Sequence, residues 1–509
     1  MPNVIEAIKD AKDGLDVLPD LHRYAAMDEP VFDDGDLERL KWYGLFHRKA
    51  TPGYFMLRMR IPNGVLTSEQ LAAIGEIANA YGRGRADITT RQNLQLRWIR
   101  IQDAPAVLQR LSAAGLTSQQ SGMDNVRNVV GCPLAGIDAD ELIDARPLAG
   151  RLQQAIVGHR GFSNLPRKFN LSITGCRDDC THAQSHDLSF TPATVATPQG
   201  GLVGFNVLVG GAMGGKEPRL AEPLDVFVPP EDVVDLACAV LTVFRDHGPR
   251  DSRKQSRLKV LLAQWGVARF RAAVEEAVGR PLRPAGAAAS ARHGGDHLGQ
   301  TAERDPALTT VGLLVPVGRI SGDDLIQLAA VARRHGRAEL RLTVQQNVLV
   351  PHVARANVPA LLTEPLLQRF TPNPSGFLRG LVSCTGIDYC HFSLIDTKGE
   401  ALELARRLDE RYVAAQTVRI HWSGCVHACG QHKIADIGLE GARVRSGEEI
   451  VPAASVVAGG RLGDDAQLAQ PVAPKTPTAD LADLVAAKIR ETLGPDAIRE
   501  RAAGGAAAG

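Results

Sequence analysis

NGVLTSEQLAAIGEIANAYGRGRADITTRQNLQL, residues 63–96, aligns without a gap to VGRISGDDLIQLAAVARRHGRAELRLTVQQNVLV, residues 317–350. Each stretch follows a proline, and its glycine and its asparagine recur 254 residues later. Further anchors recur at offsets of 249 to 252: Cys132 with Cys384, Cys176 with Cys425, Cys180 with Cys429, and Gly210 with Gly459. Repeats at one long offset indicate that the chain is a diverged internal duplication.

Each half opens with the same predicted pattern of strand, helix and strand. Period-two alternation predicts a strand over residues 54–61. Thr67 and Gln70 have the spacing of a capping box, which predicts a helix that ends near Gly82. The next strand is predicted over residues 91–101, and the corresponding second-half elements over residues 311–317, 323–335 and 340–350. The fold class that follows is α+β, with two ferredoxin-like βαβ units pairing about a pseudo-twofold axis and two larger α/β domains that bind cofactors.

The same reading divides the chain into seven segments. Residues 283–306 are rich in Ala, Gly and charge and are predicted to be a linker, and the AAGGAAAG of the C-terminus is predicted to be disordered. The predicted segments are an N-terminal extension (1–40), a βαβ half-domain (41–115), an α/β domain with the basic substrate side (116–282), the linker (283–306), a second βαβ half-domain (307–370), a second α/β domain with the cofactor cysteines (371–465), and a C-terminal helix and tail (466–509).

Composition excludes several classes of function. The chain has 509 residues, of which 44% are hydrophobic and 23% charged, and its apolar runs are shorter than the ~18 residues of a membrane span. Its 58 basic and 57 acidic residues leave a net charge of +1, so no strong field attracts nucleic acid or anionic lipid. The first residues contain acidic side chains and no apolar signal segment. We therefore expect a cytoplasmic protein, and a monomer, that binds neither nucleic acid nor membranes.

Four cysteines of the second half form a candidate metal centre. CTGIDYC contains Cys384 and Cys390, and CVHAC contains Cys425 and Cys429. Four thiolates suit either a structural zinc ion or an iron-sulfur cluster. The five-residue spacer is longer than those of zinc knuckles, which favours a cluster and leaves zinc as the alternative.

The first half has three of the four cysteines. Cys132, Cys176 and Cys180 are present, but Asp138 stands where Cys390 stands in the second half. We therefore expect no complete second cluster and interpret these three as relics that line a pocket or pack in the core. Cys238, flanked by apolar residues, is predicted to be a packing residue.

The cysteine motifs carry a resemblance to a known family. CTGIDYC followed by SGCVHACGQHKIADIG, in a duplicated chain, resembles the nitrite and sulfite reductases over residues 41–462. The resemblance implies a 4Fe-4S cluster held by Cys384, Cys390, Cys425 and Cys429 and coupled to sirohaem, with the Cys429 thiolate bridging to the sirohaem iron. A shared thiolate would remove any gap through which electrons must pass between the two groups.

Basic motifs of the first half are predicted to serve an anion. In TTRQNLQLR, residues 89–97, alternation places the polar residues on one strand face opposite Leu94, Leu96 and Trp98. DNVRN contains Arg127, and NLPRKFNLSIT places Lys168 and Asn170 side by side. The resemblance implies that four of these residues surround the open face of sirohaem and bind the substrate: Arg91, Arg127, Lys168 and Asn170. Gln345 replaces Arg91 in the second half. We therefore expect the second half to hold the cluster and the first half to offer cations to the substrate.

Two glycine-rich loops and one basic run complete the candidate sites. GGAMGGK and AGGRLG are expected to offer backbone N–H groups and a cation to the sirohaem carboxylates, through Gly210, Gly211, Lys216, Gly459, Gly460 and Arg461. Neither loop has the G-x-G-x-x-G pattern of dinucleotide binding, so electrons are expected from a protein. The run Arg245–Lys259 is expected either to dock an acidic ferredoxin or to be a solvated or cofactor-facing helix.

The resemblance implies an oxidoreductase of nitrate assimilation that reduces nitrite to ammonia by six one-electron steps, with ferredoxin as donor. Asn170 stands where sulfite reductases often have lysine, which favours nitrite over sulfite. Three alternatives remain open at this point: reduction of sulfite to sulfide, a relative in corrinoid biosynthesis, and a non-catalytic zinc-binding scaffold.

Overall fold

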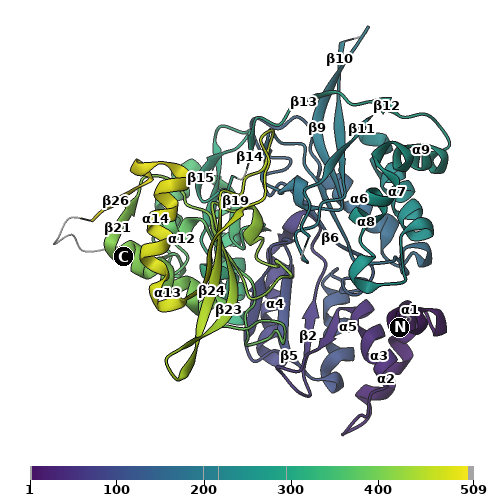
Figure 1. Cartoon of the computed structure of the whole chain (residues 1–509), viewed down its shortest axis with the longest axis horizontal. Coiled ribbons are helices and arrows are strands. Elements are labelled where there is room, and N and C mark those ends of the chain that lie inside the picture. The colour runs from purple at the N-terminus through teal and green to yellow at the C-terminus, as the bar shows by residue number, and fades with distance from the viewer. Residues whose placement is uncertain (1–2, 199, 216, 294, 502–509) are drawn as a thin grey trace.

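The computed structural model describes residues 3–198, 200–215, 217–293 and 295–501. Lys216 and the predicted disordered tail, residues 502–509, lie outside the described residues. Figure 1 shows helices α7 (Val233–His247) and α9 (Val267–Val278) on one side of the molecule and α13 (Thr397–Arg411) and α14 (Leu481–Leu493) on the other. The sheets lie between them, and the two halves are built alike, as the duplication predicts.

The N-terminal segment adds a helical layer to the first half. It contains α1 (Val4–Ala11), α2 (Leu18–Ala25) and α3 (Asp34–Arg39). Leu21 and Tyr24 of α2 are buried in the core of the ferredoxin-like half-domains, and the Tyr24 hydroxyl bonds to the Asp36 carboxylate at 2.8 Å.

Each half then forms a five-stranded sheet. The first has the order β1-β2-β5-β4-β17 and the second β15-β16-β19-β18-β3. The first-half elements are β1 (Leu45–His47), β2 (Phe55–Arg58), β3 (Val65–Thr67), α4 (Ser68–Tyr81), β4 (Arg85–Ile88), β5 (Leu94–Ile99) and α5 (Ala104–Ala113). Their second-half counterparts are β15 (Gly299–Ala302), β16 (Leu308–Leu313), β17 (Arg319–Ser321), α10 (Gly322–His335), β18 (Glu339–Leu342), β19 (Val348–Ala354) and α11 (Val358–Leu362).

The two sheets exchange their edge strands. β17 pairs with β4, aligning Ile320 with Ala86, and β3 pairs with β18, aligning Leu66 with Leu340. The two pairings use equivalent residues of the repeat, so the predicted pseudo-twofold relation is present in the register itself. Helices α4 and α10 pack against each other across the same axis. Each half therefore completes the sheet of the other.

The predicted strands of this region need two corrections. The element after each helix is a pair of strands joined by a tight turn, β4–β5 or β18–β19; the turn interrupts the predicted strand 340–350, and in the first half β4 precedes the predicted strand 91–101. Arg91 lies in that turn and not in a strand. The alternation also fails at Trp98, whose φ of 60° shifts the register of β5, and Arg97 pairs with the buried Asp87 at 2.8 Å. The capping box of Thr67 and Gln70 is confirmed.

The two α/β domains share one topology. Two parallel strand pairs are followed by a long antiparallel hairpin in each. The first contains β6 (Val126–Gly131), α6 (Arg146–Ile156), β7 (Phe169–Ile173), β8 (Asp178–Asp179), β9 (Leu188–Thr197), β10 (Gly200–Val209), β11 (Glu222–Val228), α7, α8 (Leu258–Trp265) and α9. The second contains α12 (Gly376–Arg379), β20 (Leu381–Ser383), α13, β21 (Tyr412–Ala414), β22 (Ile420–Ser423), β23 (Ile437–Ser446), β24 (Glu449–Ala458), β25 (Gln470–Pro477), α14 and β26 (Ile498–Glu500).

The segment between the halves is more ordered than a flexible linker. It forms β12 (Arg283–Pro284), β13 (Ala287–Ala288) and β14 (Arg292–His293), which pair with β11, β9 and β8. These pairings give backbone N–H and C=O groups of the segment hydrogen-bond partners within the protein. The composition of the segment does not predict such pairing. Among the described residues, no helix is long and apolar enough to cross a bilayer.

Candidate functional site

The second-half cysteines lie at the carboxyl ends of the parallel strands β20 and β22. Cys384 follows β20 directly, and Cys425 comes two residues after β22. Because carboxyl ends of parallel strands meet at one sheet edge, the two cysteine motifs meet there too. The Gly424 N–H donates to the Cys384 sulfur at 3.1 Å, and the Thr397 hydroxyl lies 3.5 Å from it. Backbone and hydroxyl donors of this kind stabilise a thiolate ligand.

The spacing of these four sulfurs distinguishes a cluster from a single ion. Burial raises the pKa of the Cys425 thiol to about 12, and the negative charges of Cys429, Cys390 and Cys384 contribute to the shift. Among the described residues, however, no three of these sulfurs lie within 4.8 Å of one another. Thiolates on one zinc ion lie no more than about 4.6 Å apart, twice the Zn–S distance. The sulfurs are therefore spaced too widely for a single zinc ion, which favours the cluster.

The turns between the paired strands connect the two halves to the cysteine loops. Gln92 and Gln346, equivalent residues with φ of 53° and 67°, bond to the backbone next to the first cysteine of a half. Gln92 bonds to both Gly131 N and Gly131 O, and Gln346 accepts from Ser383 N. The Thr90 hydroxyl donates to the Cys429 carbonyl at 3.1 Å. First-half residues therefore reach the second-half cysteines directly.

The predicted substrate residues come together beside Cys429. The Nε of Arg91 donates to the Asn170 Oδ1 at 3.2 Å. Burial, with the charges of Arg257 and Arg91, holds the pKa of Lys168 well below its usual range, while the Cys429 charge opposes this shift. Burial also lowers the pKa of Arg127, as do Arg58 and Arg91. These residues share one electrostatic environment, although they come from three separate motifs.

Two further cations of this environment were missed by the sequence analysis. Burial lowers the pKa of Arg58 to about 9, and the neighbouring charges of Arg91 and Arg48 act in the same direction. Burial lowers the pKa of Arg48, and the negative charges of Cys390 and Cys429 oppose this shift. For Arg58 the sequence did contain a signal, because the alternation of β2 places this residue on the strand face opposite the apolar residues. Like charges buried together are costly without a counter-ion, so this cation cluster of Arg48, Arg58, Arg91, Arg127 and Lys168 fits an anionic ligand.

Asp187 fixes the backbone of β7 at Asn170. Its carboxylate accepts from the Asn170 N–H at 2.8 Å and from the Arg257 guanidinium at 2.7 and 2.9 Å. Arg257 is itself nearly buried. An ion pair that holds a strand residue in this way positions the Asn170 side chain beside Arg91.

The basic run Arg245–Lys259 is largely committed to internal contacts. Arg253 pairs with the buried Asp124 at 2.7 Å, and Arg250 pairs with Glu6 at 2.7 Å. Arg257 pairs with Asp187 as described, and Arg245 pairs with Asp246. Charge density alone does not predict these ion pairs, because Asp124 and Asp187 are distant from the run in sequence. Its cofactor-facing alternative agrees with the position of Arg257.

The glycine-rich loops differ from each other in what they touch. In the first, a Cβ on Gly211 would lie 2.4 Å from the His186 carbonyl, and Gly215 N donates to the Val426 carbonyl of the CVHAC loop at 2.9 Å. In the second, a Cβ on Gly460 would lie 2.8 Å from the Ala435 carbonyl. Close backbone packing therefore explains a glycine in each loop. Arg461 is exposed and donates to the Asp465 carbonyl.

The first-half cysteines are buried together at the equivalent position. Cys132 follows β6, and Cys176 and Cys180 follow β7. Burial raises the pKa of the Cys132 thiol, but interactions with Cys176, Cys180 and His297 outweigh it and hold that pKa well below its usual range.

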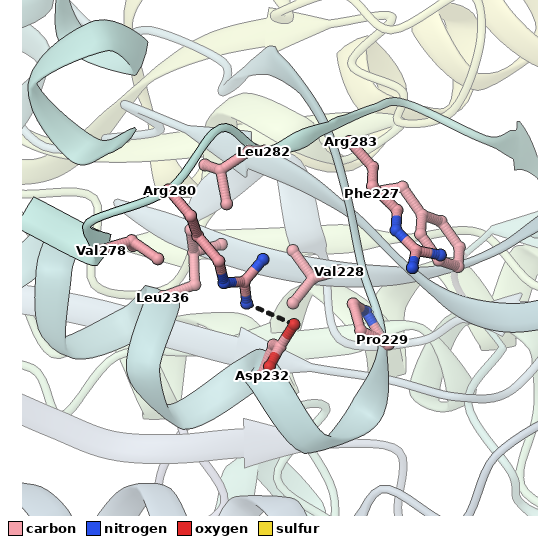
Figure 2. Close-up of a pocket in the computed structure, with 9 residues that line it drawn as sticks. All are labelled: Phe227, Val228, Pro229, Asp232, Leu236, Val278, Arg280, Leu282 and Arg283. Carbon is pink, nitrogen blue, oxygen red and sulfur yellow. Dashed lines mark hydrogen bonds and ion pairs between the residues drawn. The ribbon is translucent and has the colours of Figure 1, made fainter. Parts of the chain in front are cut away.

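A separate hollow near the surface has no connection with these residues. It lies between β11 and the end of α9, where Arg280 and Asp232 form an ion pair (Figure 2). Apolar side chains such as Leu236 and Val278 line much of its wall. None of the predicted site residues lines it.

Comparison with known proteins identifies the family. Residues 122–282 and 375–491 match the family described as the nitrite and sulphite reductase 4Fe-4S domain, and residues 47–114 and 302–367 match its ferredoxin-like half domain. The chain belongs to the nitrite and sulphite reductase family. Both duplicated units of this family are present, which confirms the predicted α+β architecture and the 4Fe-4S domains.

Members of the nitrite and sulphite reductase family resemble this chain over nearly its whole length. A ferredoxin–nitrite reductase of Synechococcus elongatus is 46% identical, with 97% of each chain covered. A chloroplastic ferredoxin–nitrite reductase of Spinacia oleracea is 41% identical, with 89% of this chain and 78% of the relative covered. The solved structure of the Mycobacterium tuberculosis NirA protein is 31% identical, with a TM-score of 0.88 and 95% and 92% of the two chains covered.

Proposed function

We propose that this chain is a ferredoxin-dependent nitrite reductase, an oxidoreductase that converts nitrite to ammonia. The observation that carries the proposal is the cation cluster gathered beside the Cys429 loop, because it couples an anion site to a redox centre. The whole-length similarity to ferredoxin–nitrite reductases supports the same reaction.

Cys384, Cys390, Cys425 and Cys429 would hold the 4Fe-4S cluster. The spacing of their sulfurs and the donors to Cys384 fit that group. Sirohaem would be held beside the Cys429 loop and the cation cluster. The unneutralised cations fit sirohaem because its carboxylates and the nitrite are both anionic. Bound there, the two groups would pass electrons from ferredoxin to nitrite.

The chain's own side chains would bind nitrite and deliver protons. Arg91, Arg127 and Lys168 balance the negative charge of the anion where water is scarce, and such preorganised cations stabilise charge that develops during reaction. Asn170, held by Asp187 and bonded to Arg91, orients the substrate. Lys168, whose pKa is lowered by burial, is suited to give a proton to an oxygen that leaves as water.

The glycine-rich loops would lie along the edge of the sirohaem. Gly210, Gly211, Gly459 and Gly460 allow close backbone approach, and Arg461 is exposed and able to turn toward a carboxylate. The contact of Gly215 with Val426 supports this role for the first loop, because it brings that loop to the cysteine motif.

The test is a visible spectrum of the purified protein, combined with assays of iron, acid-labile sulfide and ammonia production. Sirohaem bands, iron with sulfide, and ammonia formed from nitrite with reduced ferredoxin are expected. A colourless protein, or one that forms sulfide from sulfite faster than ammonia from nitrite, contradicts the proposal.

Asn170→Lys should move the preference from nitrite toward sulfite. The new cation would favour the more negative sulfite, while the loss of the amide acceptor and repulsion from Arg91 would weaken nitrite turnover. We expect the ratio of kcat/KM values, nitrite over sulfite, to fall by about tenfold, or about 1.4 kcal/mol. Steady-state kinetics on both anions with one artificial donor measure it. An unchanged ratio means that Asn170 does not set specificity.

Ferredoxin would dock where the cysteine loops reach the surface. Phe392, Leu394 and Val426 flank Cys390 and Cys425 and are 48%, 46% and 43% exposed. Burial lowers the pKa of the adjacent His391, and the charges of Arg48, Lys49 and Lys41 contribute. An apolar patch beside basic side chains suits an acidic protein donor, and it lies next to the electron acceptor. We prefer this face to the run Arg245–Lys259, whose charges are paired internally.

Lys49→Glu should therefore slow ferredoxin-driven turnover severalfold at low salt and reduce its salt dependence. Activity with a small chemical reductant should be unchanged, because that donor needs no docking surface. Lys254→Glu, an exposed charge reversal in the basic run, is the matched control and should affect neither assay. The opposite pattern, with only Lys254→Glu impaired, would return the docking site to the run.

A further inference from the structure

A second set of metal-ligating side chains lies in the first half, away from the four cluster cysteines. The sulfurs of Cys132 and Cys180 and a ring nitrogen of His297 all lie within 4.8 Å of one another. Cys176 is buried in the same cluster, with its sulfur outside that 4.8 Å group. Leu134, Ile137 and Leu349 are among the apolar residues that enclose the group. No step of the proposed nitrite reduction uses it.

The spacing of Cys132, Cys180 and His297 fits one ion and not a cluster. In the second half, by contrast, no three of the four cysteine sulfurs lie within 4.8 Å of one another. The fourth ligand has changed as well as the spacing. Asp138 occupies the position of Cys390, and His297 arrives instead from the segment that joins the halves. Three cysteines and one histidine are a common ligand set of structural zinc sites.

His297 brings one ring nitrogen to the group. Among the described residues, its Nε2 atom is buried and has no hydrogen-bond partner. A buried, unpartnered imidazole nitrogen is costly in a protein interior, and binding a metal ion removes that cost. Its backbone has a φ of 58°, a conformation that requires support from its neighbours.

The loop that carries His297 is held on both sides. Arg379 makes a double ion pair with Asp296 at 2.7 and 2.9 Å and donates to the Leu298 carbonyl at 2.7 Å. Gln345 donates to the Gly295 carbonyl at 3.1 Å. Gln345 is the second-half counterpart of Arg91. The same position of the repeat is therefore proposed to bind the anion in the first half, and it supports the His297 loop in the second. Such supporting contacts are typical of metal sites.

The thiols also have supporting contacts of their own. The Leu134 N–H points at the Cys132 sulfur at 3.4 Å, as the Gly424 N–H points at the Cys384 sulfur in the second half. The Cys176 thiol lies 3.9 Å from a carboxylate oxygen of Glu141, which can accept its proton when a metal binds.

We propose that Cys132, Cys176, Cys180 and His297 form a structural zinc site that fastens the segment between the halves to the first α/β domain. In the proposed site, Cys176, whose sulfur lies outside the 4.8 Å group, turns its side chain inward to complete the tetrahedral set. The four ligands leave no open position for a substrate, which makes the site structural. The first half has thus exchanged a redox cluster for a metal ion that carries no electrons.

Metal analysis of the purified holoenzyme tests the site. We expect about one zinc ion per chain in addition to the iron of the redox centre, and zinc-edge X-ray absorption with three sulfur ligands at about 2.3 Å and one nitrogen at about 2.0 Å. His297→Gln and Cys132→Ser should lose most of this zinc and keep the iron content and visible spectrum of the wild type. His352→Gln and Cys238→Ser, matched changes outside the group, should keep the zinc.

Several results would overturn the site. They are a holoenzyme from zinc-containing medium with no zinc, zinc that stays in both ligand variants, an absorption spectrum with only oxygen neighbours, or a disulfide between Cys176 and Cys180 in the intact protein. Iron in excess of the redox centre, with zinc absent, would overturn it equally. Because the metal content and X-ray absorption of the wild type decide the question alone, a variant that fails to fold does not remove the test.

Discussion

Cys429→Ser is expected to abolish nitrite reduction and to remove the cluster iron and the sirohaem absorption together. Serine is a poor ligand for iron, and in the proposed arrangement the one sulfur serves both groups. We expect turnover to fall by at least about 10³-fold. Iron and acid-labile sulfide assays and the visible spectrum of the purified variant measure the loss.

Cys180→Ser is the matched control, because Cys180 is the first-half equivalent of Cys429. It should retain the cluster iron and the sirohaem bands, although its zinc is expected to be lost. Full cofactor content in Cys429→Ser would contradict the ligand assignment, as would equal loss of iron in both variants.

Lys168→Met should reduce kcat/KM for nitrite by about 10²- to 10³-fold, the usual effect of removing one charge-stabilising donor. The cation cluster would lose the member suited to proton transfer, while the volume of the side chain changes little. Steady-state kinetics with an artificial donor measure the effect, and the visible spectrum must stay unchanged for the loss to be assigned to the substrate. Lys254→Met, on the surface, is the control. Unaltered kinetics in Lys168→Met would remove Lys168 from the site.

The pH dependence provides an independent check on Lys168. Burial and the charges of Arg257 and Arg91 lower its pKa, so it loses its proton at a lower pH than an exposed lysine. The charged form, needed for nitrite, is present below that pKa, and activity should fall as the pH rises through it. Lys168→Arg stays charged at higher pH, so the alkaline limb of kcat/KM should move upward. A limb that does not move assigns the titration to another group.

The duplication predicted most of the architecture, because equivalent residues repeat their local roles. The capping box of Thr67 and Gln70 has its equivalent in Ser321 and Asp324. The exchange of edge strands left no local signal, since the pairing of Ile320 with Ala86 joins distant segments. The alternation of β5 failed for a local reason, the left-handed backbone of Trp98.

The candidate site was predictable where residues act through their own motif. The NLPRKFNLSIT motif indicated that Lys168 and Asn170 lie side by side, at the start of what is β7 in the structure. Contacts between residues that are distant in sequence could not be predicted from the motifs. Arg253 and Arg257 are cations without obvious purpose in the sequence, and only the fold places Asp124 and Asp187 against them. His297, in a segment of linker-like composition, meets the cysteines for the same reason.

The exchanged edge strands have a consequence for synthesis on the ribosome. β4 is complete long before β17, and about 230 further residues must be added first, which takes roughly 10 to 50 s. During that interval β4 is an open sheet edge, able to pair with other nascent chains. A ribosome that stalls, or a protease that cuts, before Arg319 leaves this edge exposed for good. The first half is therefore expected to depend on chaperones until its own duplicate emerges to cover it.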